Sequence, residues 1–467
     1  MNNRKRTLED AHQGQNTTAV WNAPSLEAVL NTNFEELARQ LPQFGAIWRS
    51  HSQLQTPAVR CALTQALLSV HWGICTASVP VQHLAPPIPN RYFFVRWLLD
   101  TVLPLTEGVA VVGQSRQCGL DIGTGAYCVY PLLMVASSPS VDMYATDIDA
   151  DSLHCAQQHM GLNPRFASRV KLLHVQPSHR QSNSIPTGAM NGDASTLGPL
   201  RCSLEAIGSN QQLTFCMTNP PFYDVEESTS NVSEMTFNEG RYPGGEVGFC
   251  LDMIMDGLVL YLQHAADSSA VQPPVWSSTM CGKKSSWTLL RNVLWQLLGY
   301  SHVCVTEFAP KHLMRWFLAW TFRPGVVAVA QSVAWQFPVG SISSIETEQR
   351  IQAYCTSFPG GSLQCKQAGN VLQITERLDT TSGWKGDASL PENIHNIVAQ
   401  HPMARNALLP AAGHFLLRLS LTDGCVQADA SIYSPNGRAV TEKIRSQLQG
   451  EVCRTSRQWR RKLKHAV

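Results

Sequence analysis

The chain carries little charge. Asp, Glu, Lys and Arg make up 15% of its 467 residues, whereas they supply about 25% of an ordinary soluble domain. The formal net charge is only +2, which excludes a strong overall field, so any surface that binds nucleic acid must be a local patch. No apolar run approaches the ~20 residues that span a bilayer, and the first residues lack the apolar stretch of a secretory signal. We therefore expect an intracellular protein that does not cross a membrane.

Metal-binding spacings are missing as well. The fourteen cysteines are scattered, none of them stands in a C-x-x-C pair, and there is no H-E-x-x-H motif. We expect neither a zinc site nor a disulfide framework, but buried thiols in a reducing compartment. The 44% apolar content is enough for a core, and the length allows two or three domains.

The elements that are present predict an α/β fold. After a polar start over residues 1–20, the apolar spacing predicts helices, and from about residue 109 to 322 strands alternate with helices. This alternation is typical of a Rossmann-like, doubly wound sheet. The predicted helices are 33–48, 56–72 and 92–103, the first strands are 109–112 and 118–122, and polar insertions are expected at 181–199 and 265–274.

A different pattern follows Pro324 and predicts a small C-terminal α+β module. It consists of a helix near 345–358, a hairpin at 362–375, a polar linker at 379–405, strands at 415–421 and 427–433 around the turn Asp423-Gly424, and a basic helix at 441–464. We place the domain boundaries so that an N-terminal helical extension covers 1–88, the α/β domain 89–324 and the accessory module 340–467.

The sequence Asn219-Pro220-Pro221-Phe222 follows the apolar run 213–217, which is predicted to be a buried strand. Ligands of open α/β sheets bind outside the carboxyl ends of the strands. The side-chain oxygen of Asn219 and the carbonyl oxygen of Pro220 can both accept hydrogen bonds from one planar amino group, and Phe222 offers a ring for a base to stack on. The motif predicts a holder for an amino group that is to be methylated. An ordinary Asn-Pro turn after a strand is the alternative.

Two further motifs predict a nucleotide-like cofactor. Leu120-Asp121-Ile122-Gly123-Thr124-Gly125 closes one strand with a G-x-G loop, and Asp147 ends the next strand about 20 residues later, where a carboxylate can bind ribose hydroxyls. NAD would use the same device, but the third glycine of G-x-G-x-x-G is absent and Tyr127 stands near where small residues usually pack. The motifs therefore favour S-adenosylmethionine, while an ordinary helix N-cap is the alternative for Asp147.

Further motifs flank these two sites in a highly specific order. They are Ala58-Val59-Arg60, Pro89-Asn90-Arg91, Tyr130-Pro131-Leu132-Leu133, Gly244-Gly245-Glu246, Cys281-Gly282-Lys283-Lys284, Thr306-Glu307-Phe308 and Met314-Arg315-Trp316-Phe317-Leu318-Ala319-Trp320. With them, residues 33–322 resemble the methyltransferase-like-16 family of RNA adenosine N(6)-methyltransferases, in a fungal-type form. That family includes U6 small nuclear RNA enzymes and is related to a bacterial 23S ribosomal RNA adenine methyltransferase.

The resemblance implies that the protein transfers a methyl group from S-adenosylmethionine to an unpaired adenosine of a structured RNA, with U6 as the preferred target and without a metal. It also implies a nuclear protein, while a cytoplasmic location stays open as well. The implied catalytic residues are Asn219, Pro220, Pro221 and Phe222. The cofactor residues are Arg91, Asp121, Gly123, Gly125, Tyr127, Asp147, His179 and Asn219. The RNA contacts are Lys283, Lys284, Arg315, Arg454, Arg457, Arg460 and Arg461.

Several alternatives stay open. The lysines and the terminal helix can be plain surface charge, and Arg315 can belong to a buried ion pair. The segment 224–239 is rich in acids, so it would repel phosphate and suits a clamp or an autoinhibitory lid better than an RNA grip. The C-terminal module resembles the kinase-associated-like domain of animal relatives. The rival functions are of two kinds. The protein can methylate ribosomal RNA, DNA adenine or a protein glutamine, or it can be a non-catalytic RNA-folding or splicing factor that binds S-adenosylmethionine.

Overall fold

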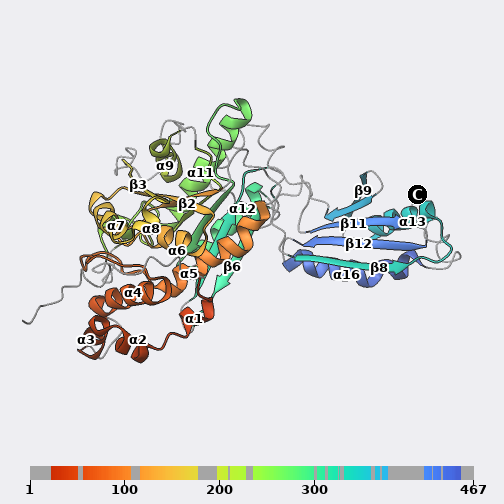
Figure 1. Ribbon diagram of the computed structural model, residues 1–467. Coiled ribbons are helices and arrows are strands. Elements are labelled where there is room, and N and C mark those ends of the chain that lie inside the picture. Colours follow the sequence, from red (N-terminus) through yellow and green to blue (C-terminus); the bar gives the residue numbers. More distant parts are fainter. Residues whose placement is uncertain are drawn as a thin grey trace, which may run out of the picture.

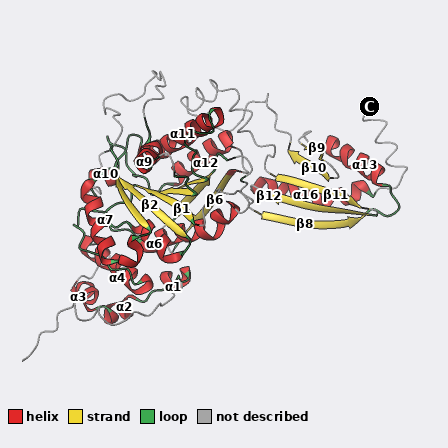
Figure 2. Ribbon diagram, turned by 45° about the horizontal axis from the view of Figure 1, so that its top comes forward, coloured by secondary structure: helices red, strands yellow, loops and turns green. Residues whose placement is uncertain are grey.

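The computed structural model describes two units, each built on its own β-sheet (Figures 1 and 2). In the described residues, no helix combines the length and the apolar character needed to cross a bilayer. The residues described are 23–50, 56–106, 116–176, 197–208, 211–227, 235–298, 302–310, 314–323, 326, 331–358, 363–368, 371–376, 415–422, 424–432 and 435–453.

The first unit contains a seven-stranded sheet in the order β3-β2-β1-β4-β5-β7-β6. Strands β3, β2, β1, β4 and β5 are parallel to one another, and β7 pairs antiparallel with both β5 and β6. The order reverses between β1 and β4, which is the switch point where open sheets of this kind bind ligands. The strands are β1 (Gln117–Ile122), β2 (Val141–Asp147), β3 (Val170–His174), β4 (Phe215–Thr218), β5 (Trp276–Cys281), β6 (Val303–Phe308) and β7 (Arg315–Trp320).

Helices cover both faces of this sheet, so the expected Rossmann-like, doubly wound fold is confirmed. Figure 1 shows α4, α5 and α6 on one side of the sheet and α9 and α11 on the other. The first side has α4 (Pro57–Trp72), α5 (Ile88–Trp97), α6 (Val129–Ser137), α7 (Ala150–Leu162) and α8 (Pro164–Ala167), and the second has α9 (Pro199–Ile207), α11 (Gly245–Ala266) and α12 (Lys284–Leu298).

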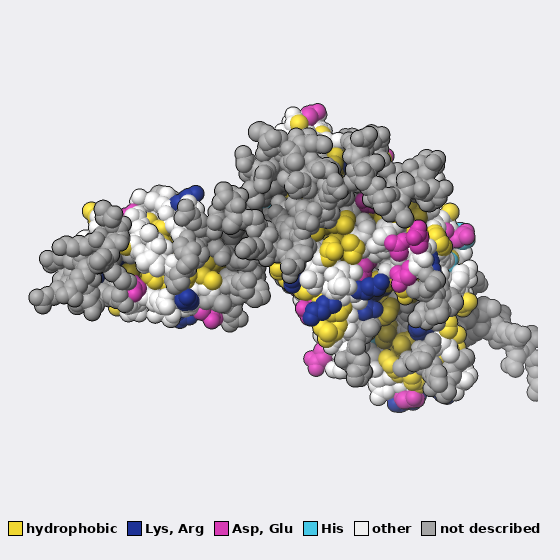
Figure 3. Space-filling model, turned by 180° about the vertical axis from the view of Figure 1, so that it is seen from behind, with side chains coloured by type: hydrophobic (Ala, Val, Ile, Leu, Met, Phe, Trp, Pro, Cys, Tyr) yellow, Lys and Arg dark blue, Asp and Glu magenta, His cyan; other side chains and the backbone are white. Residues whose placement is uncertain are grey.

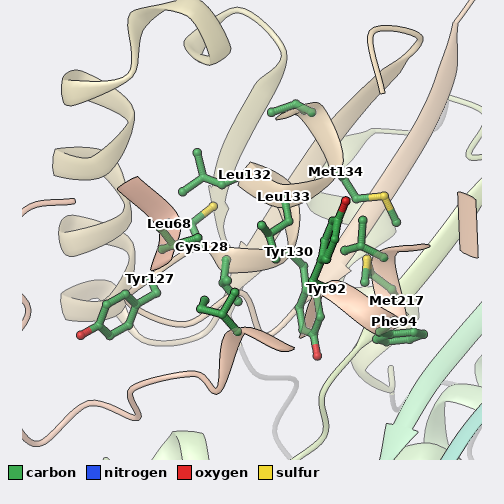
Figure 4. Close-up of a cluster of buried hydrophobic side chains, with 14 of the residues drawn as sticks. Leu68, Tyr92, Phe94, Tyr127, Cys128, Tyr130, Leu132, Leu133, Met134 and Met217 are labelled. Carbon is green, nitrogen blue, oxygen red and sulfur yellow. The ribbon is translucent and has the colours of Figure 1, made fainter. Parts of the chain in front are cut away.

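One apolar core joins the N-terminal helices to the sheet. It includes Leu68 of α4, Phe94 of α5 and Met217 of β4, all fully buried. Figure 4 shows Phe94 and Tyr130 gathered near Met217. The rings of Phe94 and Tyr130 pack edge to face, with 5.6 Å between their centres. The N-terminal helices are therefore part of the hydrophobic core of the first unit, because they share its buried residues.

The predicted helix 33–48 is wrong as a single element. The chain forms α1 (Leu26–Leu30), α2 (Phe34–Gln40) and α3 (Pro42–Ser50). Pro42 causes the break, since the residue before a proline is pushed out of the helical region, and Leu41 has φ −118° and ψ 93°. The helix expected at 92–103 begins earlier, at Ile88, and continues as a π-turn (Leu98–Val102) and a 3₁₀ turn (Leu103–Thr106).

The second unit is an antiparallel sheet of order β8-β12-β11-β10-β9. Its apolar residues pack against α13 and α16, as the predicted α+β module requires, with Ile351, Leu417 and Ile444 fully buried in its core. Strand β8 begins before the expected boundary at residue 340 and was not predicted. The elements are β8 (Gln331–Pro338), α13 (Ser344–Ser357), β9 (Leu363–Ala368), β10 (Val371–Glu376), β11 (Phe415–Thr422), β12 (Cys425–Ile432) and α16 (Pro435–Val452).

Candidate active site

The pairing of the strands brings the predicted motifs together at one edge of the sheet. Ile122 is in register with Thr146 on one side and Thr218 on the other. The next residue of each strand is therefore level with the others, and these residues are Gly123, Asp147 and Asn219. The buried hydroxyl of Thr218 donates to the carbonyl oxygen of Ile122 at 2.8 Å, which ties the ends of β4 and β1 to each other.

The glycine loop after β1 leaves open space where a ligand can approach. Gly123 and Gly125 have φ values of +74° and +64°, a region that side chains other than glycine rarely adopt. A Cβ atom at Gly123 would meet no atom within 4 Å. The N–H of Gly125 donates to Oδ2 of Asp147 at 2.8 Å, so the carboxylate at the end of β2 fixes the loop.

The N-cap alternative for Asp147 is not what the structure shows. The side chain of Asp149 accepts from Ser152 and caps α7, while Oδ1 of Asp147 accepts the N–H of Asp149 at 2.9 Å. Burial raises the pKa of Asp147 to about 6, against the opposing effect of the two backbone N–H donors. A further donor, such as a ribose hydroxyl, would stabilise the charged form of this carboxylate.

Asp121 lies underneath the glycine loop and is fully buried. Neither of its carboxylate oxygens accepts a hydrogen bond of good geometry. Burial raises the pKa of Asp121 to about 7, partly offset by the neighbouring Thr124 hydroxyl. A buried carboxylate of this kind favours its neutral form at a cost in stability, which is typical of functional sites.

The turn Asn219-Pro220-Pro221-Phe222, the predicted catalytic turn, presents a buried acceptor that has no partner among the described residues. Asn219 follows β4, and its Oδ1 atom is inaccessible to solvent and accepts no hydrogen bond. Leaving such a group unpaired costs about 1–3 kcal/mol, so its persistence suggests that a ligand supplies the donor. The ring of Phe222 is half-buried and rests on Gly282, where a Cβ atom would lie 2.7 Å from a ring carbon.

Two arginines converge on the same edge. The side chain of Arg91 is 4% exposed, its guanidinium lies 5.7 Å from the ring centre of Tyr130, and Nη1 lies 3.5 Å from Sδ of Met280. Met280 follows the residue of β5 that pairs with Thr218, which places it level with Asn219. Burial, and next the charge of Arg91, lower the pKa of Arg315.

No ion pair joins Arg91 or Arg315 to a carboxylate among the residues that the structure describes. The alternative of a structural ion pair for Arg315 therefore has no support there. The charge of Glu246 acts on Arg315, and the charges of Arg91 and Asp121 act on each other, but none of these contacts is an ion pair. The two neighbouring guanidinium groups are therefore still suited to an anionic group of a ligand, such as a carboxylate or a phosphate.

The acidic segment after the turn is partly used to hold the site together. Glu239 reaches across to the stretch before α5, where Oε1 lies 3.2 Å from Nδ1 of His83 and Oε2 accepts the N–H of Leu84 at 3.2 Å. The guanidinium of Arg241 donates to carbonyl oxygens within the segment, among them that of Asp224 at 2.9 Å. Residues 228–234 lie outside the described part of the chain.

Of the remaining predicted residues, Lys283 lies near the turn, with Nζ 5.8 Å from the ring centre of Tyr223. Lys283 and Lys284 are exposed at the start of α12, and seen from behind the first unit carries a group of basic side chains with acidic ones beside it (Figure 3). Tyr127 is 2% exposed and points to the opposite end of the core cluster from Tyr130 (Figure 4), so its ring is a packing group in this structure. The other predicted positions, His179, Arg454, Arg457, Arg460 and Arg461, lie outside the described residues.

Sequence reasoning noted the motifs around Glu246 and Gly282 without giving them a role, counted Glu239 only among the acids of the segment 224–239, and missed His83. Glu246 binds the backbone of Gly282, although 36 residues separate them in the sequence. No local pattern could reveal that contact. Among the described residues, no group of three or more His, Cys, Asp or Glu side chains could hold a metal ion.

With this geometry in hand, comparison with known proteins identifies the family. Residues 33–196 and 202–324, which are more than half of the chain, match a family described as RNA methyltransferase. The chain belongs to this RNA methyltransferase family. The match covers the glycine loop, the turn that begins at Asn219, and both Lys283 and Lys284.

Individual relatives of this family are similar at a moderate level. U6 small nuclear RNA (adenine-(43)-N(6))-methyltransferase of Schizosaccharomyces pombe is 30% identical over 252 residues, which cover 52% of this chain and 55% of the relative. Ribosomal RNA large subunit methyltransferase F of Pseudomonas aeruginosa is 28% identical over 277 residues, which cover 57% of this chain and 75% of the relative.

Among solved structures, the hMettl16 catalytic domain in complex with MAT2A 3′UTR hairpin 6 is 25% identical, with a TM-score of 0.45, and the match covers 63% of this chain and 94% of that one. The chain spans about half the length of the relatives from Danio rerio, Xenopus laevis and Gallus gallus that it matches.

Proposed function

We propose that this protein transfers a methyl group from S-adenosylmethionine to the 6-amino group of an unpaired adenosine in RNA. The observation that carries the proposal is the buried, unpartnered Oδ1 of Asn219. It lies level with the glycine loop, in a turn that continues into an aromatic ring, and the chain belongs to a family of RNA methyltransferases. An amino group with two N–H donors is the ligand chemistry that this acceptor fits.

The residues around the glycine loop fit S-adenosylmethionine, which when bound supplies a methyl group already activated by its sulfonium. Gly123 leaves open space for the ligand, and the half-buried carboxylate of Asp147 would accept from ribose hydroxyls. Arg91 would hold the carboxylate of the methionine part, because its guanidinium is buried at the level of Asn219 and forms no ion pair with any carboxylate that the structure describes.

The turn would then act on the base. Oδ1 of Asn219 and the carbonyl oxygen of Pro220 accept the two protons of the amino group, which favours its pyramidal, more nucleophilic form. This interaction strengthens as positive charge develops on the nitrogen in the transition state. Phe222 stacks on the ring, which is worth ~1–3 kcal/mol for a base on an aromatic side chain. Alignment of nitrogen and methyl group lowers the barrier further.

U6 small nuclear RNA is the target that we propose first, because the Schizosaccharomyces pombe relative is named for that RNA. An adenosine that is already unpaired fits best, since extruding a paired base costs a few kcal/mol. Lys283, Lys284 and Arg315 are the proposed phosphate contacts of the first unit, and a U6 target implies a nuclear protein. Ribosomal RNA is the second candidate, because the Pseudomonas aeruginosa relative is matched over the larger share of its length.

One experiment separates these targets. Purified full-length protein is incubated with radiolabelled S-adenosylmethionine and total cellular RNA, and the RNA is resolved by size. Label in a single small RNA supports the U6 proposal, and label in the large ribosomal RNA supports the second candidate. Binding of S-adenosylmethionine without transfer to any RNA would refute both, and a parallel reaction with protein extract detects a protein substrate.

A further inference from the structure

Glu246 joins two elements directly behind the catalytic turn. It lies in the first turn of α11, and only 2% of it is exposed. Its Oε2 accepts the N–H of Gly282 at 2.8 Å and its Oε1 accepts the N–H of Lys283 at 3.0 Å. Both amides belong to the turn between β5 and α12, so one buried carboxylate fixes the position of that turn relative to α11.

The turn held by Glu246 is the surface on which the ring of Phe222 rests. A Cβ atom at Gly282 would lie 2.7 Å and 2.8 Å from two carbons of that ring, so the ring touches the backbone of the glycine. The backbone of Phe222 is packed from α11 as well, because a Cβ atom at Gly245 would lie 3.3 Å from its carbonyl oxygen. The start of α11 therefore fixes Phe222 twice, through its backbone and, by way of Glu246, through its ring.

We infer that Glu246 is a positioning residue, which holds the ring of Phe222 in the orientation that stacks on the target base. The inference rests on the proposed function for the role of the ring, but the contact itself does not. A carboxylate offers only acceptors to the two N–H groups, whereas the amide of a glutamine would turn an NH2 toward one of them and leave that partly buried donor without a partner. The turn, and the ring on it, would then shift.

Gly282→Ala tests the same contact from the other side. Gly282 is not in the left-handed region, so alanine is tolerated by the backbone and the added methyl acts through the ring alone. A methyl group 2.7 Å from a ring carbon must displace Phe222, while the carboxylate of Glu246 stays intact. Matched controls are Gly161→Ala, where a Cβ would meet nothing within 4 Å, and Glu205→Gln on the exposed surface of α9.

The direct readout is the environment of the ring. 4-Fluorophenylalanine is placed at position 222 by amber suppression in the full-length protein, and its fluorine resonance is recorded for each variant. We expect the resonance to move in Glu246→Gln and in Gly282→Ala, and to stay at the wild-type position in both controls. An unmoved resonance in folded Glu246→Gln overturns the inference, whatever the protein methylates. If that variant does not fold, Glu246→Asp, which keeps the charge but shortens the reach, is judged by the same criterion.

The functional readout uses proteins without the fluorine label. With total cellular RNA as substrate, kcat/KM for RNA is expected to fall about 10-fold or more in both variants, as loss of a stacked base would cause. The Kd for S-adenosylmethionine should change less than about 2-fold, because the glycine loop is untouched. A loss of cofactor affinity equal to the loss of kcat/KM would indicate general damage and refute a positioning role. Absence of transfer by the wild-type protein refutes the proposed function, and the fluorine signal still decides the contact.

Discussion

The structure predicts that Asn219→Ala lowers the catalytic activity of the protein without lowering its stability. In most proteins, removal of a buried polar side chain that is hydrogen-bonded lowers the free energy of unfolding. Oδ1 of Asn219 is inaccessible but accepts no hydrogen bond, so the free protein loses no hydrogen bond to this oxygen when the amide is removed. The same atom is the proposed acceptor for the amino group of the base, and its loss should therefore be felt in catalysis alone.

The magnitudes follow from these two roles. Relief of a buried, unpaired acceptor is worth about 1–3 kcal/mol, which is offset in part by the packing lost when the side chain is shortened. We therefore expect the thermal midpoint of Asn219→Ala to equal or exceed that of the wild type. Loss of one hydrogen bond that is strongest in the transition state costs ~10²–10³ in kcat, or about 2.7–4 kcal/mol.

The assay combines methyl transfer to RNA under saturating S-adenosylmethionine with thermal unfolding and cofactor binding on the same preparations. Thr218→Ser is a useful control, because it keeps the hydroxyl that donates to Ile122 at 2.8 Å and removes only a methyl group next to Asn219. A variant Asn219→Ala that methylates RNA at a rate within a few-fold of the wild type would refute the acceptor scheme. A large drop in thermal midpoint would show instead that the amide serves the fold.

Three further predictions concern the cofactor, the N-terminal helices and the terminal tail. Burial raises the pKa of Asp147 to about 6, and ribose hydroxyls bind its charged form. Affinity for S-adenosylmethionine measured by calorimetry should therefore weaken as the pH falls below about 6, and Asp147→Asn should show a smaller dependence, with Asp121 still titrating. His159 accepts the N–H of Ala77 at 2.9 Å, and burial lowers the pKa of His159 to about 4. Its imidazole must stay neutral in the folded protein, so stability that is present above pH ~6.5 is lost as the pH falls toward 4, by up to about 3 kcal/mol. The acid unfolding of His159→Asn should lack this component. Ending the chain after Cys453 keeps the buried Ile444, Leu448 and Val452 of α16. It removes six basic residues, which are Arg454, Arg457, Arg460, Arg461, Lys462 and Lys464. The slope of log K against log salt for RNA binding should therefore flatten by up to ~4, and an unchanged slope would mean that the tail does not contact phosphate.

Much of the fold could be predicted because its signals are local. The helix 56–72 is observed as Pro57–Trp72 with Thr56 as its cap, and the strand 118–122 is observed as Gln117–Ile122. The hairpin expected at 362–375 and the strand pair around Gly424 both form. In each case the apolar spacing, the capping residue and the turn residues agree with one another, and such agreement is what makes an element readable from its sequence.

Other elements could not be predicted because the deciding interaction is distant or competes with the apolar pattern. The apolar residues of 33–48 suit one helix, but Pro42 divides it. Strand β8 takes its place only by pairing with β12, about a hundred residues later in the chain, and α16 begins at Pro435 although the basic pattern starts at 441. The strand expected at 109–112 lies outside the described residues.

The candidate site shows the same division in chemical terms. Residues that would touch a ligand stand in short motifs, because a strand end and the turn after it are formed by consecutive residues. Asn219 and Gly123 are two such residues. They lie near each other because β1 and β4 pair in parallel. Residues that hold those motifs in place come from elsewhere. Glu239 reaches His83 across 156 positions and Glu246 reaches Gly282 across 36. The acidic segment that contains Glu239 predicted repulsion of phosphate, whereas Glu246 stood in a motif to which no role was given. The sign of a charge predicts a partner only when the position of the side chain is known, and here that position makes both acids internal supports of the candidate site.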